Sequence, residues 1–451
     1  MSKRIGVLLS LAVASAIQVA QAAPLEQVVS DSMLENPEVA AALNAKRAVA
    51  EEVREAVGGR YPDIDLLIGV GYEWTDSPTT RSAQDATGGN GQEELWRQEA
   101  TLNFRHMLFD GLATESEIQR QEARLRSADA RVREVAEQFA LDTARSYLEL
   151  IRRQELLRLS KETLYNHVRI YDQIRKRSES GLGSLSSIQQ AESRLALAEV
   201  NVLAADNNLR DAKANYIRVV GVEPPEQFEV PMGLNVPASL DDALEQAAAN
   251  QPTLQLAESD IEAAKAQYEA AYSRRYPTFH FEMERTLFND IDGVSGDNED
   301  FTAMLRLRYN LYNGGSDDAR IRKTQYQIHE AEDIRHSADR QVVQSLGLSW
   351  NAYEILGQQV KFLEQYVASS EKTRDSYLKQ FDIGQRSLLD LLDTENEVFS
   401  AKNTLTDSTF DYLIAQYRVL NGTGQLLSAL DVSLPQDGAM VDATEMAGTN
   451  P

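Results

Sequence analysis

Two long stretches of the sequence contain almost no residue that would interrupt an α-helix. Residues 112–178 contain neither proline nor glycine, and residues 316–381 contain no proline and only Gly347 and Gly357. The segment "TESE" at Thr114–Glu117 has the pattern of a capping box at the start of the first helix. Apolar residues recur every seven positions in both stretches: Ile118, Leu125, Val132 and Phe139, then Leu150, Leu157, Leu164 and Tyr171, and later Leu346, Tyr353, Val360 and Val367. Such helices are roughly 100 Å long at ~1.5 Å per residue, and the seven-residue spacing predicts coiled-coil contact with other helices.

The chain contains an internal duplication. Three pairs of segments match: Tyr61-Pro62 and Tyr276-Pro277, "LFDG" at 108–111 and "LYNG" at 311–314, and "SGLGSLSSIQQAE" at 180–192 and "IGQRSLLDLLDTE" at 383–395. The first pair is separated by 215 residues and the other two by 203, so the first copy carries 12 additional residues. These must lie between its two strands, where residues 79–94 are polar, because loops at strand tips tolerate insertions.

Both copies show the same predicted order of a helix, two strands, a very long helix, a glycine turn and a second long helix. The duplication therefore predicts a first structural repeat at 23–221, a linker at 222–237 and a second repeat at 238–430. Residues 1–22 are expected to form a signal peptide, because Lys3 and Arg4 precede an apolar run that ends in "AQA". The tail at 431–451 has little periodicity and is expected to be disordered.

The predicted strands alternate between apolar and other residues. Pro62 and Pro277 mark strand entry, and strands 96–109 and 278–289 show the alternation more weakly than the other two. The clearest apolar faces consist of Ile64, Leu66, Ile68, Val70, Tyr72 and Trp74, and of Phe301, Ala303, Leu305, Leu307, Tyr309 and Leu311. A soluble antiparallel sheet against a helix is one interpretation. A membrane sheet is the other, because the strands have about the length that crosses a bilayer, yet four strands close a barrel only together with other copies.

Composition excludes several classes of function. The chain has 70 Asp and Glu against 45 Lys and Arg, a net charge of -25, which disfavours nucleic acid as a partner. It has no cysteine, which excludes disulfides, thiolate catalysis, cysteine-based zinc sites and a lipid-modified cysteine. No later segment is apolar for long enough to form a transmembrane helix.

Two rival classes of protein are considered. His329-Glu330 suggests a metalloprotease, but the HExxH motif needs histidine at position 333, which is Asp333. Gly69 and Gly71 lie within a strand pattern and open no helix, so they form no dinucleotide loop. We therefore predict no enzyme, no metal and no cofactor. A periplasmic coiled-coil adaptor would share the long helices but would not need four strands of bilayer length.

Glycines divide the long helices into hairpins. Gly181 and Gly183 in the first copy and Gly384 in the second mark the turns, and the next helices should begin near Ser184 and Ser387. In the last of these helices three acidic residues share one face, because their spacing is three and then four: Asp390, Asp393 and Glu397. A solvated face and a functional stripe are the two interpretations.

The duplication, the Tyr-Pro pairs, the "LFDG" and "LYNGG" strand exits and the two glycine turns resemble the TolC family of outer-membrane efflux and secretion proteins. The resemblance covers the mature chain to about Leu430. It implies a mainly α-helical fold with a membrane β-barrel, in which a homotrimer shares a 12-stranded barrel in outer-membrane lipid and extends a coiled-coil tunnel into the periplasm. It also implies a periplasmic adaptor (membrane fusion protein) and an inner-membrane transporter as partners.

The turn "DIGQRSLLDLLDTENEVFSAKN" resembles most closely the branch of the family that serves type I protein secretion. That branch implies an ABC transporter and an exported protein substrate, with large adhesins among the candidates. The absence of a lipobox cysteine departs from the lipid-anchored drug-efflux branch. A multidrug or small-molecule efflux pump is the alternative.

The resemblance also implies roles for the residues at the hairpin turns. Asp390 and Asp393 match aspartates that face the pore and ring its periplasmic entrance, and Glu397 lies on the same helix face. Arg386 matches an arginine that bonds the neighbouring hairpin. Phe381 and Ser187 occupy the places of a tyrosine and an aspartate that bond each other in the closed state. We therefore expect the closed state to depend on packing and on Arg386.

Overall fold

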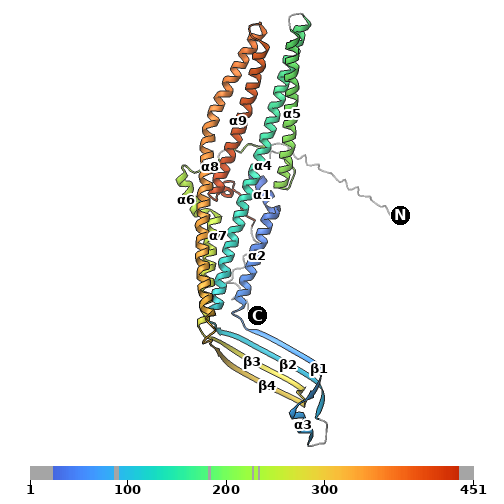
Figure 1. Ribbon diagram of the computed structural model, residues 1–451, viewed down its shortest axis with the longest axis vertical. Helices are drawn as coiled ribbons and strands as arrows, with labels where there is room; N and C mark the ends of the chain where they lie inside the picture. Colours follow the sequence, from blue (N-terminus) through green and yellow to red (C-terminus); the bar gives the residue numbers. More distant parts are fainter. Residues whose placement is uncertain (1–23, 86–90, 181–183, 226–227, 232–233, 436–451) are drawn as a thin grey trace, which may run out of the picture. The chain divides into compact units, whose positions relative to one another are not determined.

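The computed structural model describes residues 24–85, 91–180, 184–225, 228–231 and 234–435 (Figure 1). The predicted signal peptide, Gly181, Gly183 and the end of the tail lie outside the described residues. The first half of the chain forms α1 (Leu25–Glu35), α2 (Pro37–Gly58), β1 (Asp63–Asp76), α3 (Pro78–Asp85), β2 (Gln92–Phe109), α4 (Ala113–Glu179) and α5 (Leu185–Val220). The second half forms α6 (Leu240–Asn250), α7 (Pro252–Tyr272), the 3-10 turn η1 (Ser273–Arg275), β3 (Thr278–Ile291), β4 (Val294–Arg308), α8 (Ser316–Asp382), α9 (Leu388–Gly422) and α10 (Leu426–Ala429).

The chain is mainly helical with four strands, as predicted. The order α2–β1–β2–α4–α5 returns as α7–β3–β4–α8–α9. The two stretches without helix breakers form α4 and α8, each a helix of 67 residues, so the prediction of two very long helices is confirmed. In the described part of the chain, no helix has an apolar stretch sufficient to span a membrane.

Contacts divide the chain into two compact units. The sheet unit consists of Ala40–Val135 and Asn250–Val343, and the hairpin unit consists of Met1–Val39, Ala136–Ala249 and Gln344–Pro451. Both α4 and α8 contribute residues to each unit. The hairpin unit contains the hairpins α4–α5 and α8–α9, whose turns are the predicted functional region (Figure 1).

The sheet unit contains one antiparallel sheet in the order β1–β2–β3–β4 (Figure 1). The predicted apolar face of β1 is open to solvent, since Ile64 is 65% and Val70 is 72% exposed. The other face carries ion pairs between strands, such as Arg97 to Glu73 at 2.9 Å. Within the described residues β1 and β4 each pair with one strand, which leaves two sheet edges without a partner.

The ends of β4 differ from the prediction. Tyr309 and Leu311 were expected in the strand, but β4 ends at Arg308. The reason is that Arg308 pairs with Thr278, the first residue of β3, and the preceding Pro277 has no N–H to continue the ladder. At the other end β4 begins at Val294, because pairing with β3 extends through a polar segment that contains no apolar alternation.

The predicted capping box at Thr114–Glu117 is wrong. The helix α4 begins one residue before Thr114, and Asp110 caps it: its carboxylate accepts hydrogen bonds from the Ala113 N–H at 3.0 Å and the Thr114 N–H at 2.7 Å. Gly111 makes this turn possible, because its φ is +74° and a Cβ there would lie 2.5 Å from the carbonyl oxygen of Ser273. The strand exit thus caps the helix before "TESE" begins.

Candidate functional site

The turn between α8 and α9 is held by a capping box. Gly384 adopts φ +78°, which a residue with a side chain rarely adopts, and the chain then turns into Ser387. The Ser387 hydroxyl accepts the Asp390 N–H at 3.2 Å, and the Asp390 carboxylate accepts the Ser387 N–H at 3.4 Å. Hydrogen bonding of the Asp390 carboxylate to the hydroxyl and the N–H of Ser387, together with Arg386 at 3.7 Å, lowers the pKa of Asp390. Asp390 is therefore held as an anion at the start of α9.

The first copy uses serine at the equivalent position. Ser184 caps α5 by accepting the Ser187 N–H at 3.2 Å, and Ser187 stands where the second copy has Asp390, 203 residues later. Both predicted helix starts are thus confirmed, since α5 begins at Leu185 and α9 at Leu388. The predicted turn residues Gly181 and Gly183 lie outside the described residues.

The other two carboxylates of the predicted acidic stripe are exposed on α9. Asp393 forms an ion pair with Arg194 of α5 at 3.1 Å, and Glu397 accepts a hydrogen bond from the Tyr366 hydroxyl at 3.4 Å. Both side chains remain accessible to water in the single chain. Their role around a pore stays a prediction, because a ring needs three chains.

Arg386 contacts its own hairpin in the single chain. Its Nε donates to Gln380 Oε1 at 3.0 Å, and its guanidinium lies 4.2 Å from the centre of the Tyr377 ring. With the weak ion pair to Asp390, these contacts hold the side chain against the α8–α9 turn. The predicted bond to a neighbouring hairpin stays a prediction.

Phe381 packs between the two hairpins. It is 4% exposed and belongs to an apolar cluster from α4, α5, α8 and α9 that also contains Ile170, Ile174, Ala191, Leu388, Leu391 and Leu392. The guanidinium of Arg177, at the end of α4, lies 4.5 Å from the centre of the Phe381 ring. It also donates to the carbonyl oxygens of Phe381 at 3.3 Å and Asp382 at 3.1 Å. This role of Arg177 was not predicted from the sequence.

Further polar contacts join the two hairpins along their length. Lys402 of α9 lies 3.2 Å from Glu162 of α4 and 2.9 Å from Glu371 of α8. Burial would lower the pKa of Lys402, but these two carboxylates outweigh burial and raise it. Closer to the start of α4 in the hairpin unit, Arg152 pairs with Asp407 at 2.6 Å and with Asp411 at 3.0 Å. The hairpins are thus coupled by charge as well as by apolar packing.

One contact between the hairpins involves a buried carboxyl group, so its strength depends on whether that group is ionised. Glu395 of α9 is 6% exposed and lies 3.6 Å from Arg374 of α8 and 3.4 Å from the Asn166 amide of α4. Burial raises the pKa of Glu395 although both partners oppose the shift. Glu395, Lys402 and Arg152 were not predicted from the sequence as contacts between the hairpins.

One signal in the sequence could have found part of this network. At the 203-residue shift, Arg194 of the first copy corresponds to Glu397 of the second. Opposite charges at equivalent places of two packed helices indicate pairing between them, and Arg194 does bind Asp393, one turn from Glu397. The predicted strand-entry residues Pro62 and Pro277 directly precede β1 and β3.

Comparison with known families and proteins identifies the architecture. The family model described as "Outer membrane efflux protein" matches residues 28–222 and 243–425. The outer membrane protein TolC of Escherichia coli K12 is 24% identical over 449 residues, which cover 94% of this chain and 87% of that protein. The proteases secretion protein PrtF of Dickeya chrysanthemi is 20% identical and covers 83% of this chain and 82% of its own length.

A solved structure shows the same fold. The crystal structure of CusC superposes with a TM-score of 0.77 at 17% sequence identity, over 92% of this chain and 96% of that chain. The two matched segments of the family model each include one hairpin, α4–α5 in the first and α8–α9 in the second. The chain therefore belongs to the outer membrane efflux protein family and is an outer-membrane channel of the TolC type.

Proposed function

We propose that the protein forms a homotrimeric exit duct of the outer membrane for type I secretion. In this function an inner-membrane ABC transporter and a periplasmic adaptor deliver a protein substrate, which passes through the channel to the exterior. The helical hairpins form the periplasmic part, and their turns form its entrance.

The open sheet is the observation that carries the proposal. Its four strands expose an apolar face, and β1 and β4 leave two edges without a partner among the described residues. Unpaired backbone groups are not tolerated in lipid, so the sheet must close with strands from other chains. Three copies contribute 12 strands, which is within the size range of outer-membrane barrels.

A protein substrate is supported by the similarity to PrtF, whose name records the secretion of proteases. It is also supported by the turn that resembles the secretion branch. The alternative substrate class is a small molecule or ion, as in the cation efflux system whose protein CusC is 24% identical over 413 residues.

The test uses a source strain without the gene. Secretion predicts that one or more proteins disappear from the culture medium and return when the wild-type gene is supplied. Efflux predicts instead unchanged secreted proteins and an increased sensitivity to toxic small molecules or metal ions. If the strain shows neither missing secreted proteins nor increased sensitivity, both substrate classes are contradicted.

A further inference from the structure

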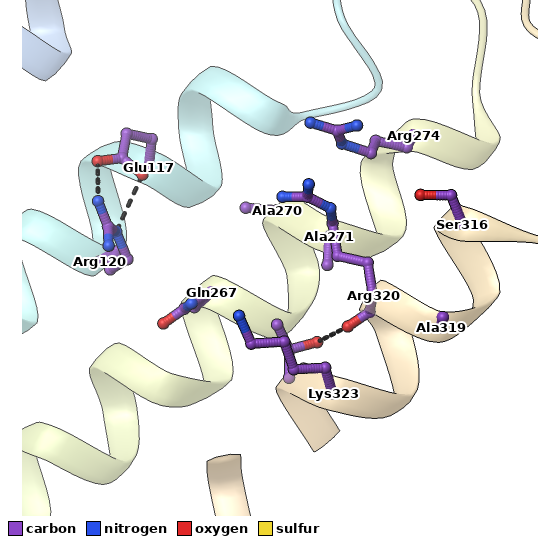
Figure 2. A pocket seen from close by; sticks show the side chains of 11 residues that line it. Glu117, Arg120, Gln267, Ala270, Ala271, Arg274, Ser316, Ala319, Arg320 and Lys323 are labelled. Atoms are coloured by element: carbon purple, nitrogen blue, oxygen red, sulfur yellow. Dashed lines mark hydrogen bonds and ion pairs between the residues drawn. The ribbon is translucent and has the colours of Figure 1, made fainter. Parts of the chain in front are cut away.

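The sheet unit contains a positively charged cavity close to the base of its strands. The cavity measures about 520 Å³ and lies between α4, α7 and α8 (Figure 2). Four cationic side chains line it: Arg120, Arg274, Arg320 and Lys323. Small residues of α7 and α8, among them Ala271 and Ala319, leave the space open. The cavity is therefore large enough for a small ion or a headgroup.

The cations of this cavity are only partly neutralised. Arg120 donates to Glu117 at 3.0 and 2.6 Å, and this contact, with one from Gln121, outweighs burial and lowers the pKa of Glu117. Arg274 has Asp317 at 3.8 Å, too far for a hydrogen bond. Neither Arg320 nor Lys323 has an ion pair in the part of the chain that the structure describes.

These cations lie close together around one cavity. Figure 2 shows the side chains of Arg274 and Arg320 directed into the same space beside Ala270 and Ala271. The side chains of Arg274, Arg320 and Lys323 are exposed, so water screens their mutual repulsion, yet a chain with a net charge of -25 gathers them around one cavity. A convergence of cations in an acidic protein thus indicates an external negative group.

The chemistry of the cations selects the class of ligand. Guanidinium groups bind the oxygens of phosphate in a bidentate manner, and an ammonium group adds a compact positive charge. We propose that this cavity binds a phosphate-type oxyanion, with Arg274, Arg320 and Lys323 as its principal contacts. Arg120 remains hydrogen-bonded to Glu117 and holds the part of α4 that lines the cavity.

Two sources could supply the phosphate. Arg274 lies in η1, four residues before β3 begins, and Ser316 begins α8 eight residues after β4 ends. The site is therefore near the end of the strands at which the helices begin, where the phosphate of a membrane lipid headgroup would be within reach. Free phosphate or a phosphorylated solute is the other source.

The first experiment measures inorganic phosphate binding to the full mature protein in detergent by isothermal titration calorimetry. Arg320→Gln should weaken binding about tenfold, because a hydrogen bond to a charged group contributes that order of affinity. Arg322→Gln is the matched control: it removes the same charge two residues away, from an exposed side chain that does not line the cavity. Ala319→Leu should also weaken binding, because it fills the cavity without changing charge.

The second experiment distinguishes the sources. Native mass spectrometry compares phosphatidylglycerol with diacylglycerol of the same acyl chains, on wild type, Arg320→Gln and Arg322→Gln. Preferential retention of phosphatidylglycerol that depends on Arg320 assigns the site to a lipid headgroup. Binding of inorganic phosphate alone assigns it to a soluble ligand. Equal binding by all three proteins in both experiments, with unchanged thermal melting, would overturn the proposal.

Discussion

Asp390 has a local role that is independent of any pore. Its carboxylate closes the capping box with Ser387, so the start of α9 depends on this residue within a single chain. In a trimer the same side chain would stand in a ring of three. At an assumed spacing of ~8 Å in water, each like-charge pair costs about 0.5 kcal/mol, which opposes closure only weakly. A substitution that tests the pore role must therefore remove the charge of Asp390 and keep its hydrogen bond in the capping box.

The double variant Asp390→Asn with Asp393→Asn makes this separation. Asparagine keeps a side-chain oxygen for the cap, so α9 should still begin at Leu388. Removing the charges should lower the preference for cations, and the block by multivalent cations, in single-channel recordings. Asp206→Asn with Asp211→Asn, on α5, is the matched control. Unchanged selectivity in the first variant would assign the acidic stripe to a solvated face.

Glu137 predicts a dependence of stability on pH. This side chain of α4 is 5% exposed and accepts the N–H groups of Leu426 and Leu427 at 3.2 Å each. Burial nevertheless raises the pKa of Glu137 to about 7. The folded protein thus keeps this proton to a higher pH than the unfolded chain, so the contribution to stability is complete below about pH 4.5 and is lost as pH rises to 7. The loss is on the order of 3 kcal/mol.

The measurement is thermal melting of wild type and Glu137→Gln between pH 5 and pH 8. The variant cannot ionise at this position, so its melting temperature should fall less over this range than that of the wild type. Parallel pH profiles would show that Glu137 ionises alike in the folded and unfolded states.

At the scale of elements, the two hairpins are coupled by side chains that reach from one to the other. Arg177 connects the end of α4 to the α8–α9 turn, and Arg194 connects α5 to Asp393. Lys402 and Arg152 continue the contacts along α4 and α9. A movement of one hairpin past the other would disrupt these contacts, and those of Arg177 and Arg194 lie nearest the turns.

Arg177→Gln should therefore raise the resting conductance of the channel in planar bilayers. It removes the hydrogen bonds to Phe381 and Asp382 and the contact with the Phe381 ring. Arg175→Gln is the matched control, because among the described residues Arg175 pairs only within its own helix, with Asp172 at 3.7 Å and Glu179 at 3.8 Å. Arg386→Ser should also raise conductance if Arg386 bonds the neighbouring hairpin in the closed state. Equal conductance of all variants would contradict control by these contacts.

The connections between strands predict the topology of the sheet. Strands β1 and β2 are separated by residues 77–91, which include α3, whereas β3 and β4 are separated by residues 292–293. The longer connection is where the duplication places its 12 additional residues. We expect this connection outside the cell, so an epitope inserted at Gly89, beyond the described residues, should bind antibody on intact cells. Labelling only after permeabilisation of the outer membrane would reverse the topology.

At the scale of the whole molecule, β1 and β4 each have one edge without a partner in the described part of the chain, and these edges predict association. Native mass spectrometry of the detergent-purified protein should show a trimer, and the protein should need detergent to remain in solution. Since the chain has no cysteine, single cysteines placed in β1 and β4 report their contact without background. Crosslinking should then produce covalent trimers. A stable monomer, or a trimer without a β1–β4 crosslink, would exclude the shared barrel.

The sequence by itself determined the features that depend on neighbouring residues. The absence of proline from both stretches and the scarcity of glycine predicted both 67-residue helices. The starts of the helices that follow them were correctly placed near Ser184 and Ser387, because helix propagation and capping are local. Alternation predicted the strands, and matching motifs predicted the family and the mainly helical fold.

The tertiary structure alone decided which distant residues meet. The end of β4 depends on Pro277 across the sheet, and the cap of α4 belongs to Asp110 because Gly111 turns the chain beside Ser273. Arg177 binds carbonyl groups 204 and 205 residues away, and backbone carbonyls leave no mark in a sequence. The cavity of Arg274, Arg320 and Lys323 likewise exists only because α7 and α8 pack side by side. Contacts between helices depend on which face each presents, and periodicity indicates that a partner exists without identifying its residues.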